Sequence, residues 1–307
     1  GGAGYVGTEL CNKLSQNKKY LVTCLDNFWF GDKVSKEVKK VKRDIRSLKN
    51  SDFKDFDTVI HLAYLSNDPL CELNGRDTWE CGPLALYSIL EKCKKNSVKH
   101  FIFASSGSVY GIKKEKKVTE NLSLKPISDY NKSKMICEKV LDSYEKNFKI
   151  TIVRPATVCG FSNRLRLDVV LNLFCYQSFF KKKITVLGGN QIRPILHIKD
   201  MVGVYDFILK KNITGIYNVG FENLTVKKIA EEICKRNKTQ IEFKKSNDPR
   251  SYRMNSEKII KKGFKPKYNF KDCINDLLTE FKKGYKPSDK NWNLKWLLKR
   301  NYIKKNG

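Results

Sequence analysis

Three glycines spaced by two residues, Gly1, Gly4 and Gly7, constrain this chain more than any other feature of its sequence. Glycine permits a tight turn and close approach of a phosphate to the main chain, because no Cβ stands in the way. Residues 8–16 are expected to form a helix whose N-terminal amides and dipole face negative charge. The pattern predicts a dinucleotide-binding turn, provided that a strand leads into it. Because the sequence opens inside the turn, we expect this first strand to be missing from the chain.

Short apolar segments alternate with helical segments along the first half of the chain. The expected elements are strands at 20–25, 57–63, 99–105, 149–154 and 215–220, with helices at 78–96 and 128–147. Strands separated by helices form right-handed βαβ units and a parallel sheet. We therefore predict an α/β fold with a Rossmann-type doubly wound parallel sheet and a smaller C-terminal lobe.

The same order of segments predicts how the chain is divided. Residues 1–160 are expected to form the dinucleotide-binding domain, to which a segment near 193–222 returns. Residues 161–192 and 223–307 are expected to form the smaller, mostly helical lobe. The sequence has no internal repeat and no long linker, so the two parts should pack against each other.

Composition limits the classes of protein to which the chain can belong. No run of about 18 apolar residues is present, so the sequence predicts no membrane span. Ten cysteines occur without a C-x-x-C pair or a spaced histidine partner, which favours buried thiols, a cytoplasmic setting and no metal site. The formal charge is +29, from 50 lysines and 11 arginines against 32 acidic residues. Because the lysines occur along the whole chain, we interpret the charge as a solvated basic surface. A role in binding nucleic acid or an anionic membrane remains the alternative.

Asp26 ends the second expected strand, about twenty residues after the glycine turn. A carboxylate at this place accepts hydrogen bonds from the hydroxyls of an adenosine ribose and repels a 2′-phosphate, which favours NAD over NADP. A cap of a helix or a turn is the structural alternative. Asp44 and Ile45 are the next candidates and would meet the adenine.

The strongest chemical signal is Tyr130-Asn131-Lys132-Ser133-Lys134. Lys134 follows Tyr130 by four positions, so the two side chains share one face of a helix. A nearby ammonium stabilises a phenolate and lowers the tyrosine pKa, so that the phenol can serve as a general base. Upstream, a buried strand ends in the hydroxyls of Ser105 and Ser106, where α/β sheets place their ligands. Ser106 could contact both a substrate hydroxyl and the Tyr130 oxygen, although such hydroxyls also satisfy turns.

Together these segments resemble the extended short-chain dehydrogenases/reductases, most closely the NAD-dependent sugar-nucleotide epimerase/dehydratase family with UDP-glucose 4-epimerase-like members. The resemblance covers nearly the whole chain. It rests on the glycine turn, Asp26, Asp44-Ile45, His61-Leu62-Ala63, Ser105-Ser106, Val109-Tyr110-Gly111, Tyr130 with Lys134, Arg154-Pro155-Ala156, Gln191-Ile192-Arg193-Pro194 with His197 and Asp200, and Asp248-Pro249-Arg250-Ser251-Tyr252.

The resemblance implies a role for each matching residue. Tyr130 would be the general base, Lys134 would bind the nicotinamide ribose, and Ser106 would orient the reacting hydroxyl. The residues implied in binding NAD are Gly1, Gly4, Tyr5, Val6, Gly7, Asp26, Asn27, Asp44, Ile45, Leu62, Ala63, Ser105, Tyr130, Lys134 and Pro155. Those implied in binding a nucleotide-diphosphate sugar are Ser106, Thr157, Arg193 and Arg250, of which the arginines suit phosphate because their planar fork binds it with two hydrogen bonds.

Departures from the family pattern narrow the reaction. Relatives that act as 4,6-dehydratases carry an acidic residue after the catalytic hydroxyl, whereas this chain has Gly107-Ser108. Without that acid, epimerisation at C4 through a 4-keto intermediate becomes the favoured activity. Tyr64 replaces the alanine of His-Leu-Ala-Ala, and Cys81-Gly82-Pro83 replaces an Asn-Val pair. Thr157 stands where UDP-galactose 4-epimerases tend to carry asparagine, so UDP-galactose is a less favoured substrate.

Other readings remain open at this point. A dehydratase, decarboxylase or 4-ketoreductase would use the same fold, and a non-catalytic protein that binds NAD or RNA is an alternative of another class. We interpret His61, His100 and His197 as structural. By analogy with the family, we expect a homodimer formed by the helices at 84–97 and 128–147. We expect no membrane partner and no specific nucleic-acid partner.

Overall fold

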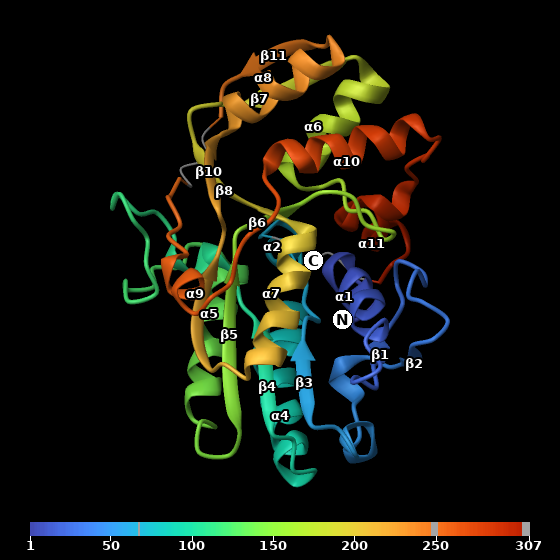
Figure 1. Ribbon diagram of the computed structural model, residues 1–307, viewed down its shortest axis with the longest axis vertical. Coiled ribbons are helices and arrows are strands. Elements are labelled where there is room, and N and C mark those ends of the chain that lie inside the picture. The colour runs from blue at the N-terminus through green and yellow to red at the C-terminus, as the bar shows by residue number, and fades with distance from the viewer. Residues whose placement is uncertain (67, 247–250, 303–307) are drawn as a thin grey trace.

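The computed structural model describes residues 1–66, 68–246 and 251–302, and a four-stranded parallel sheet forms the centre of its larger part (Figure 1). The strand order is β3-β4-β5-β9. The strands are β3 (Thr58–His61), β4 (His100–Ala104), β5 (Lys149–Pro155) and β9 (Gly215–Val219). The strands expected at 57–63, 99–105, 149–154 and 215–220 are thus confirmed, as is their parallel pairing.

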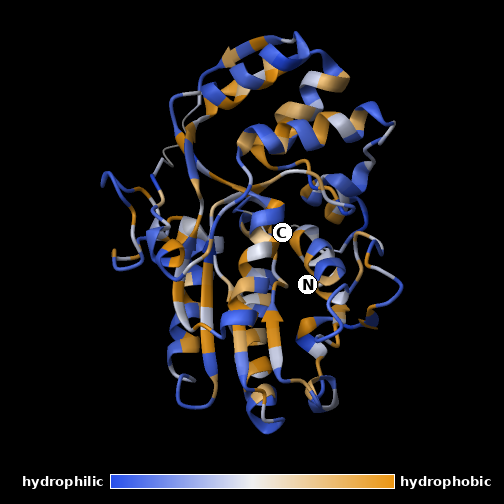
Figure 2. Ribbon diagram, in the orientation of Figure 1, coloured by the Kyte–Doolittle hydropathy of each residue, from blue (hydrophilic) through white to orange (hydrophobic). Residues whose placement is uncertain are grey.

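Helices cover both faces of this sheet. One face packs against α1 (Tyr5–Ser15) and α7 (Ile198–Lys211), and the other against α4 (Ala85–Lys95) and α5 (Asp129–Asp142). Successive side chains of a strand point to opposite faces, and β4 follows this rule. Phe101 and Phe103 pack with α4 and α5, whereas Ile102 packs with α1 and α7. Figure 2 shows hydrophobic residues along these strands and hydrophilic residues in the outer loops.

A separate two-stranded parallel sheet lies beside the glycine turn. It consists of β1 (Thr23–Asp26) and β2 (Lys39–Lys42). The strand expected at 20–25 therefore begins three residues later and ends at Asp26. The sequence did not predict β2, because a lysine-rich strand lacks the apolar alternation that marks a half-buried one, and such charges are typical of sheet edges.

The helix expected at 78–96 is interrupted. It consists of α3 (Gly75–Trp79), a π-type turn (Glu80–Leu84) and α4. Proline has no backbone N–H and its ring disturbs the preceding turn, so Pro83 accounts for the irregularity. The helix expected at 128–147 ends at Asp142.

The smaller part lies at the top of Figure 1. Its core joins α6 (Val170–Tyr176), α8 (Val226–Asn237) and α10 (Phe270–Lys282), beside the parallel pair β7 (Lys183–Leu187) and β11 (Gln240–Lys244). A mixed sheet in the order β10-β8-β6 connects it to the larger part, with β6 (Thr157–Cys159), β8 (Ile192–His197) and β10 (Glu222–Thr225). The smaller part therefore contains more strand than the sequence predicted.

Three further short helices complete the described structure, namely α2 (Asp68–Leu73), α9 (Glu257–Lys261) and α11 (Asn293–Lys299).

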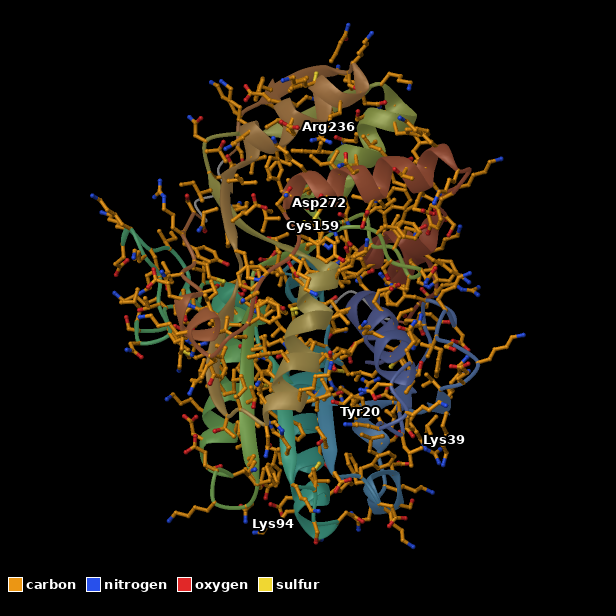
Figure 3. All side chains as sticks on the ribbon, in the orientation of Figure 1. Tyr20, Lys39, Lys94, Cys159, Arg236 and Asp272 are labelled. Carbon is orange, nitrogen blue, oxygen red and sulfur yellow. The ribbon has the colours of Figure 1, made fainter. Side chains whose placement is uncertain are left out.

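Basic side chains are spread over the surface. Lys94 lies at the lower end of the molecule, Lys39 at one side and Arg236 in the upper part (Figure 3). The ten cysteines are free thiols, and nine of them are buried. Among the described residues, we find no helix with the length and apolar character that crossing a membrane requires.

Candidate active site

A cavity of about 490 Å³ lies where the carboxyl ends of the parallel strands meet the loops of the smaller part. Open α/β sheets bind their ligands at this edge. The cavity is lined by every residue implied in binding NAD, and by Ser106, Thr157 and Arg193 from the substrate set. Arg250 lies outside the described residues, as do Asp248 and Pro249.

The glycine turn forms one wall of the cavity and has no room for side chains. A Cβ on Gly7 would lie 2.3 Å from the Gly1 carbonyl oxygen, and a Cβ on Gly1 would lie 2.3 Å from the Ala63 amide nitrogen. Helix α1 begins directly after Gly4, and no side chain caps its first amides. A turn that a Cβ would fill, followed by uncapped helix amides, fits the pyrophosphate of a dinucleotide.

Asp26 closes the turn from the side of β1. Its carboxylate accepts hydrogen bonds from the backbone amides of Ala3, at 3.0 Å, and Phe28, at 2.7 Å. These bonds fix the carboxylate at the edge of the cavity, where it also remains available to ribose hydroxyls. Further along, Asp44 accepts from the Arg46 side chain at 2.8 Å, and this hydrogen bond holds the pKa of the Asp44 carboxyl below its usual value.

Tyr130 and Lys134 both face the cavity from α5, as their spacing predicted. Burial raises the pKa of the Tyr130 phenol, and a hydrogen bond with Ser106 opposes this effect. Burial also lowers the pKa of Lys134 to about 8. Burial therefore governs both groups, and the pKa of Tyr130 is raised, not lowered as the sequence predicted.

The Lys134 ammonium is held by the main chain and by an aromatic ring. It donates to the Ala104 carbonyl oxygen at 2.6 Å and lies 3.6 Å from the centre of the Tyr64 ring. The Tyr64 hydroxyl donates to Ser133 at 2.7 Å, and a Cβ on Gly82 would lie 2.5 Å from that hydroxyl oxygen. Two departures from the family pattern are thus linked, because Gly82 leaves the space that Tyr64 occupies.

A chain of hydrogen bonds extends from Ser106 to a carboxylate that the sequence analysis did not single out. Ser106 and Ser108 share a hydrogen bond of 2.7 Å between their hydroxyls, and Ser108 donates to the Asn131 side-chain oxygen. Asn131 donates to Asp68 at 3.3 Å, and Ser128 donates to the same carboxylate. Asp68 lines the cavity, so an acidic group is present there although none follows Ser106 in sequence.

Behind the site, a buried ion pair ties α5 to the sheet. Arg154 donates to both carboxylate oxygens of Glu138, at 3.0 and 2.6 Å, and to the Tyr110 hydroxyl at 2.7 Å. Ser105 donates to the same carboxylate. Glu138 lies one turn after Lys134, so this pair fixes the helix that carries both candidate catalytic groups. The sequence offered no periodic signal for the pairing of Glu138 with Arg154.

The three histidines lie away from the cavity, as none of them appears among its described lining residues. His61 and His100 are buried, and burial lowers their pKa to about 3 and about 4. The ring of His197 accepts a hydrogen bond of 3.0 Å from the Lys199 amide at the start of α7.

The loop that leads into α6 brings further charged residues to the cavity, namely Arg164, Arg166 and Asp168. Arg166 is paired with Asp168 at 2.6 Å. Arg164 is buried, and its Nε and Nη1 atoms have no hydrogen-bond partner among the described residues. The sequence analysis passed over all three, since an R-x-R-x-D segment carries no specific signal.

Comparison with known proteins agrees with this geometry. Residues 1–220 match the model of the NAD dependent epimerase/dehydratase family. The chain is 30% identical over 237 residues to an uncharacterized UDP-glucose epimerase, YtcB, of Bacillus subtilis, covering 72% of this chain and 75% of the relative. It is 30% identical over 249 residues to a dTDP-D-glucose 4,6-dehydratase of Dictyostelium discoideum, covering 72% of this chain and 57% of the relative.

Among solved structures, the UDP-glucuronic acid 4-epimerase of Bacillus cereus in complex with UDP-glucuronic acid and NAD superposes with a TM-score of 0.82. The two chains are 26% identical, and the match covers 92% of this chain and 98% of the epimerase. Relatives that epimerise and relatives that dehydrate therefore both resemble this chain.

Proposed function

The chain belongs to the NAD-dependent epimerase/dehydratase family, and on this premise we propose that it inverts the configuration at C4 of a nucleotide-diphosphate sugar. The observation that carries the proposal is the placement of Tyr130, Lys134 and Ser106 in one cavity with the glycine turn. A binding protein has no need for a phenol, an ammonium and a hydroxyl that converge in this way. The family assigns NAD as the cofactor.

We propose that the NAD-binding residues divide the cofactor among them. The glycine turn and the first amides of α1 would hold the pyrophosphate, Asp26 and Asn27 the adenosine ribose, and Asp44 with Ile45 the adenine. Lys134 would hold the nicotinamide ribose. The remaining contacts would come from Tyr5, Val6, Leu62, Ala63, Ser105, Tyr130 and Pro155. In this division, residues 1–160 with the segment near 193–222 bind NAD, and residues 161–192 and 223–307 bind the sugar nucleotide.

The chemistry of the proposal balances within the active site. When bound, NAD⁺ supplies the acceptor for a hydride and, once reduced, its donor. Tyr130 takes the proton of the C4 hydroxyl while the hydride leaves C4, and a 4-keto sugar results. The sugar turns in the cavity, C4 receives the hydride on its opposite face, and Tyr130 returns the proton. Ser106 holds the C4 oxygen near Tyr130 throughout.

Tyr130 acts as a base only after its phenol has lost the proton. Burial raises the pKa of this phenol, so burial alone keeps Tyr130 protonated at neutral pH. A cationic nicotinamide ring and the Lys134 ammonium would both favour the phenolate, because opposite charges lower an acid's pKa. We therefore propose that Tyr130 becomes a base only when NAD⁺ is bound. Such coupling would keep proton abstraction from preceding hydride transfer.

On the substrate side, we propose that Arg193 binds the diphosphate of the sugar nucleotide and that Thr157 contacts the sugar. Both line the cavity. Arg250 is proposed for the same diphosphate on the basis of the family pattern alone. Closure of the smaller part over the sugar would exclude water and protect the keto intermediate.

The 4,6-dehydratase is the second candidate, and one observation favours it. Gly107 and Ser108 supply no acid, but Asp68 lines the cavity and connects to Ser106 through Ser108 and Asn131. Asp68 could protonate a departing C6 hydroxyl if that hydroxyl reached it. The Asp68 carboxylate already accepts hydrogen bonds within the protein, from Ser128 and Asn131. Because these contacts give it a structural role, we place epimerisation before dehydration.

The deciding experiment incubates the full chain and NAD⁺ with UDP-, dTDP- and GDP-linked hexoses and uronic acids, one at a time. Products are analysed by mass spectrometry and by proton NMR at C4. A product of unchanged mass with inverted C4 supports the proposal. A product that has lost water indicates the dehydratase, and one that has lost carbon dioxide indicates a decarboxylase. Tyr130→Phe serves as the inactive control.

We further propose a cytoplasmic homodimer formed through α4 and α5. Leu84 and Tyr87, at the start of α4, are 64% and 57% exposed, which is unusual for large apolar side chains on one helix face. Sedimentation at micromolar concentration tests this arrangement with the wild type and Tyr87→Arg. A wild type that sediments only as a monomer contradicts it.

A further inference from the structure

A buried cation with free hydrogen-bond donors faces the cavity. Arg164 is 4% exposed, and its Nη2 donates to the Asn293 side-chain oxygen at 2.6 Å. Its other two donor nitrogens, Nε and Nη1, are buried without a partner in the part of the chain that the structure describes. The guanidinium carbon lies 3.8 Å from the centre of the Phe30 ring, which fixes the plane of the fork. Buried guanidinium donors are normally satisfied, so this pair of nitrogens points to a missing anion.

The charges around Arg164 do not neutralise it within the described residues. Arg166, two residues along, is paired with Asp168, so the attraction of Asp168 for Arg164 is shared with this second cation. Burial and the neighbouring Arg166 together lower the pKa of Arg164 to about 9. An anion that enters the cavity would offset the cost of burying the Arg164 charge next to Arg166. The two unpartnered nitrogens lie on different edges of the planar guanidinium, so each can donate to a separate oxygen of a diphosphate.

Contacts of the same loop place this cation beside the dinucleotide turn. The Ser162 hydroxyl donates to the Tyr5 carbonyl oxygen at 3.1 Å and to the Glu9 carboxylate at 3.0 Å. The Asn163 amide donates to Glu9 at 2.8 Å. The segment that carries Arg164 is thus hydrogen-bonded to the first turns of α1, whose uncapped amides face the cavity. Asp26 and Tyr5 both act electrostatically on Arg164, which agrees with this position.

We propose that Arg164 binds a diphosphate in this cavity, namely the pyrophosphate of NAD, together with the glycine turn. The glycine turn offers only backbone amides and a helix dipole, and Arg164 supplies a full positive charge to the same group. Arg164 belongs to the segment 161–192, which we expect in the smaller lobe. Binding of the cofactor by Arg164 would therefore also hold this lobe against the glycine turn.

The diphosphate of the sugar nucleotide is the other possible source of the same chemistry, and the experiment separates the two. The full chain, freed of nucleotide, is titrated calorimetrically with NAD⁺ and, separately, with UDP. The variants are Arg164→Met and, as a matched loss of one positive charge, Arg300→Met. Arg300 ends α11, the helix that begins at Asn293, and is exposed.

For Arg164→Met, we expect the Kd for NAD⁺ to rise about 100-fold, as for truncation of one partner of a buried charge pair. The Kd for UDP should change by less than about threefold, and Arg300→Met should leave both constants within about threefold. The melting temperature of nucleotide-free Arg164→Met should equal or exceed that of the wild type, because the substitution removes an uncompensated buried charge. A residue needed only for folding would instead lower it.

Two results overturn the proposal. If UDP affinity falls while NAD⁺ affinity is kept, Arg164 serves the sugar nucleotide, and if neither affinity changes, it binds no diphosphate. Should Arg164→Met fail to fold, a crystal structure of the wild type with NAD decides the question. Arg164 Nε or Nη1 at hydrogen-bond distance from a pyrophosphate oxygen supports the proposal, and a guanidinium turned away from the pyrophosphate refutes it. None of these readouts depends on which sugar reaction the enzyme performs.

Discussion

The buried pair of Arg154 and Glu138 offers the sharpest test of how this fold is held together behind its active site. Both side chains are 4% exposed. In Arg154→Met, the Glu138 carboxylate loses two hydrogen bonds and its only close cation among the described salt bridges, and keeps the hydroxyl of Ser105. The Tyr110 hydroxyl loses a partner as well, but it still donates to Asn218 at 2.8 Å.

The loss of stability in Arg154→Met follows from the unpaired Glu138 carboxylate that remains in the interior. An unpaired buried carboxylate costs about 3–5 kcal/mol, which is a large share of the roughly 5–15 kcal/mol that stabilises a typical domain. The double variant Arg154→Met/Glu138→Leu removes both charges and refills the space with apolar atoms. We expect it to be more stable than Arg154→Met by about 2 kcal/mol, because the unpaired charge is gone.

Urea denaturation at 25 °C, followed by fluorescence, measures these free energies of unfolding. The control is Lys132→Met on the same helix, which breaks an exposed pair with Asp129 and should change stability by less than about 0.5 kcal/mol. The reasoning is refuted if Arg154→Met loses less than about 1 kcal/mol. It is also refuted if the double variant is no more stable than the single one.

Three further predictions concern the site and its surroundings. Tyr130→Phe should keep NAD, measured by the nucleotide released on denaturation. Its turnover should fall at least about 100-fold, since a general base contributes that much to the rate. A variant that keeps a tenth of the wild-type rate would contradict the role of Tyr130 as the base. Gly7→Ala should lower NAD affinity in a titration, because its Cβ would lie 2.3 Å from a backbone oxygen, whereas Gly203→Ala, with no atom nearer than 3.7 Å, should not. Since the folded protein holds the pKa of His61 at about 3 and of His100 at about 4, the unfolded chain binds more protons below pH 6.5. Stability should therefore fall by about 1.6 kcal/mol per histidine between pH 6.5 and 5; an unchanged urea midpoint at pH 5 would refute this.

The parts of the fold that local sequence decides were predictable. The glycine turn and the apolar strands at 99–105 and 149–154 carry their own signals, because a tight turn needs glycine and a strand buried on both faces needs continuous apolar residues. The membership of the epimerase/dehydratase family and its NAD cofactor followed from the order of these segments and are confirmed. The strand β2 was missed, since its lysines reflect exposure at a sheet edge and leave no pattern to read.

From residue spacing alone, the site was predictable only where its residues share one element, and the resemblance to the family supplied the residues of the other elements. Tyr130 and Lys134 lie one turn apart on α5, so their convergence follows from helix geometry. Asp68 reaches the same cavity from a different segment, and its link to Ser106 passes through Ser108 and Asn131. No spacing in the sequence encodes a contact of that kind. The space that Gly82 leaves for the Tyr64 hydroxyl is hidden for the same reason, although both positions stood out as departures from the family pattern.

Two buried arginines show how burial and pairing together indicate function. Arg154 is held by a carboxylate on a neighbouring helix, so its charge is balanced inside the protein and its role is to fix the site. Arg164 is just as buried, yet two of its nitrogens have no partner within residues 1–66, 68–246 and 251–302, and its pKa falls to about 9. A folded protein can keep an unpaired buried charge when a ligand of opposite charge binds next to it. The cost of the unpaired charge is then removed on binding and adds to the affinity for the ligand. The difference between the two residues is therefore the physical reason to look for a phosphate at Arg164 and not at Arg154.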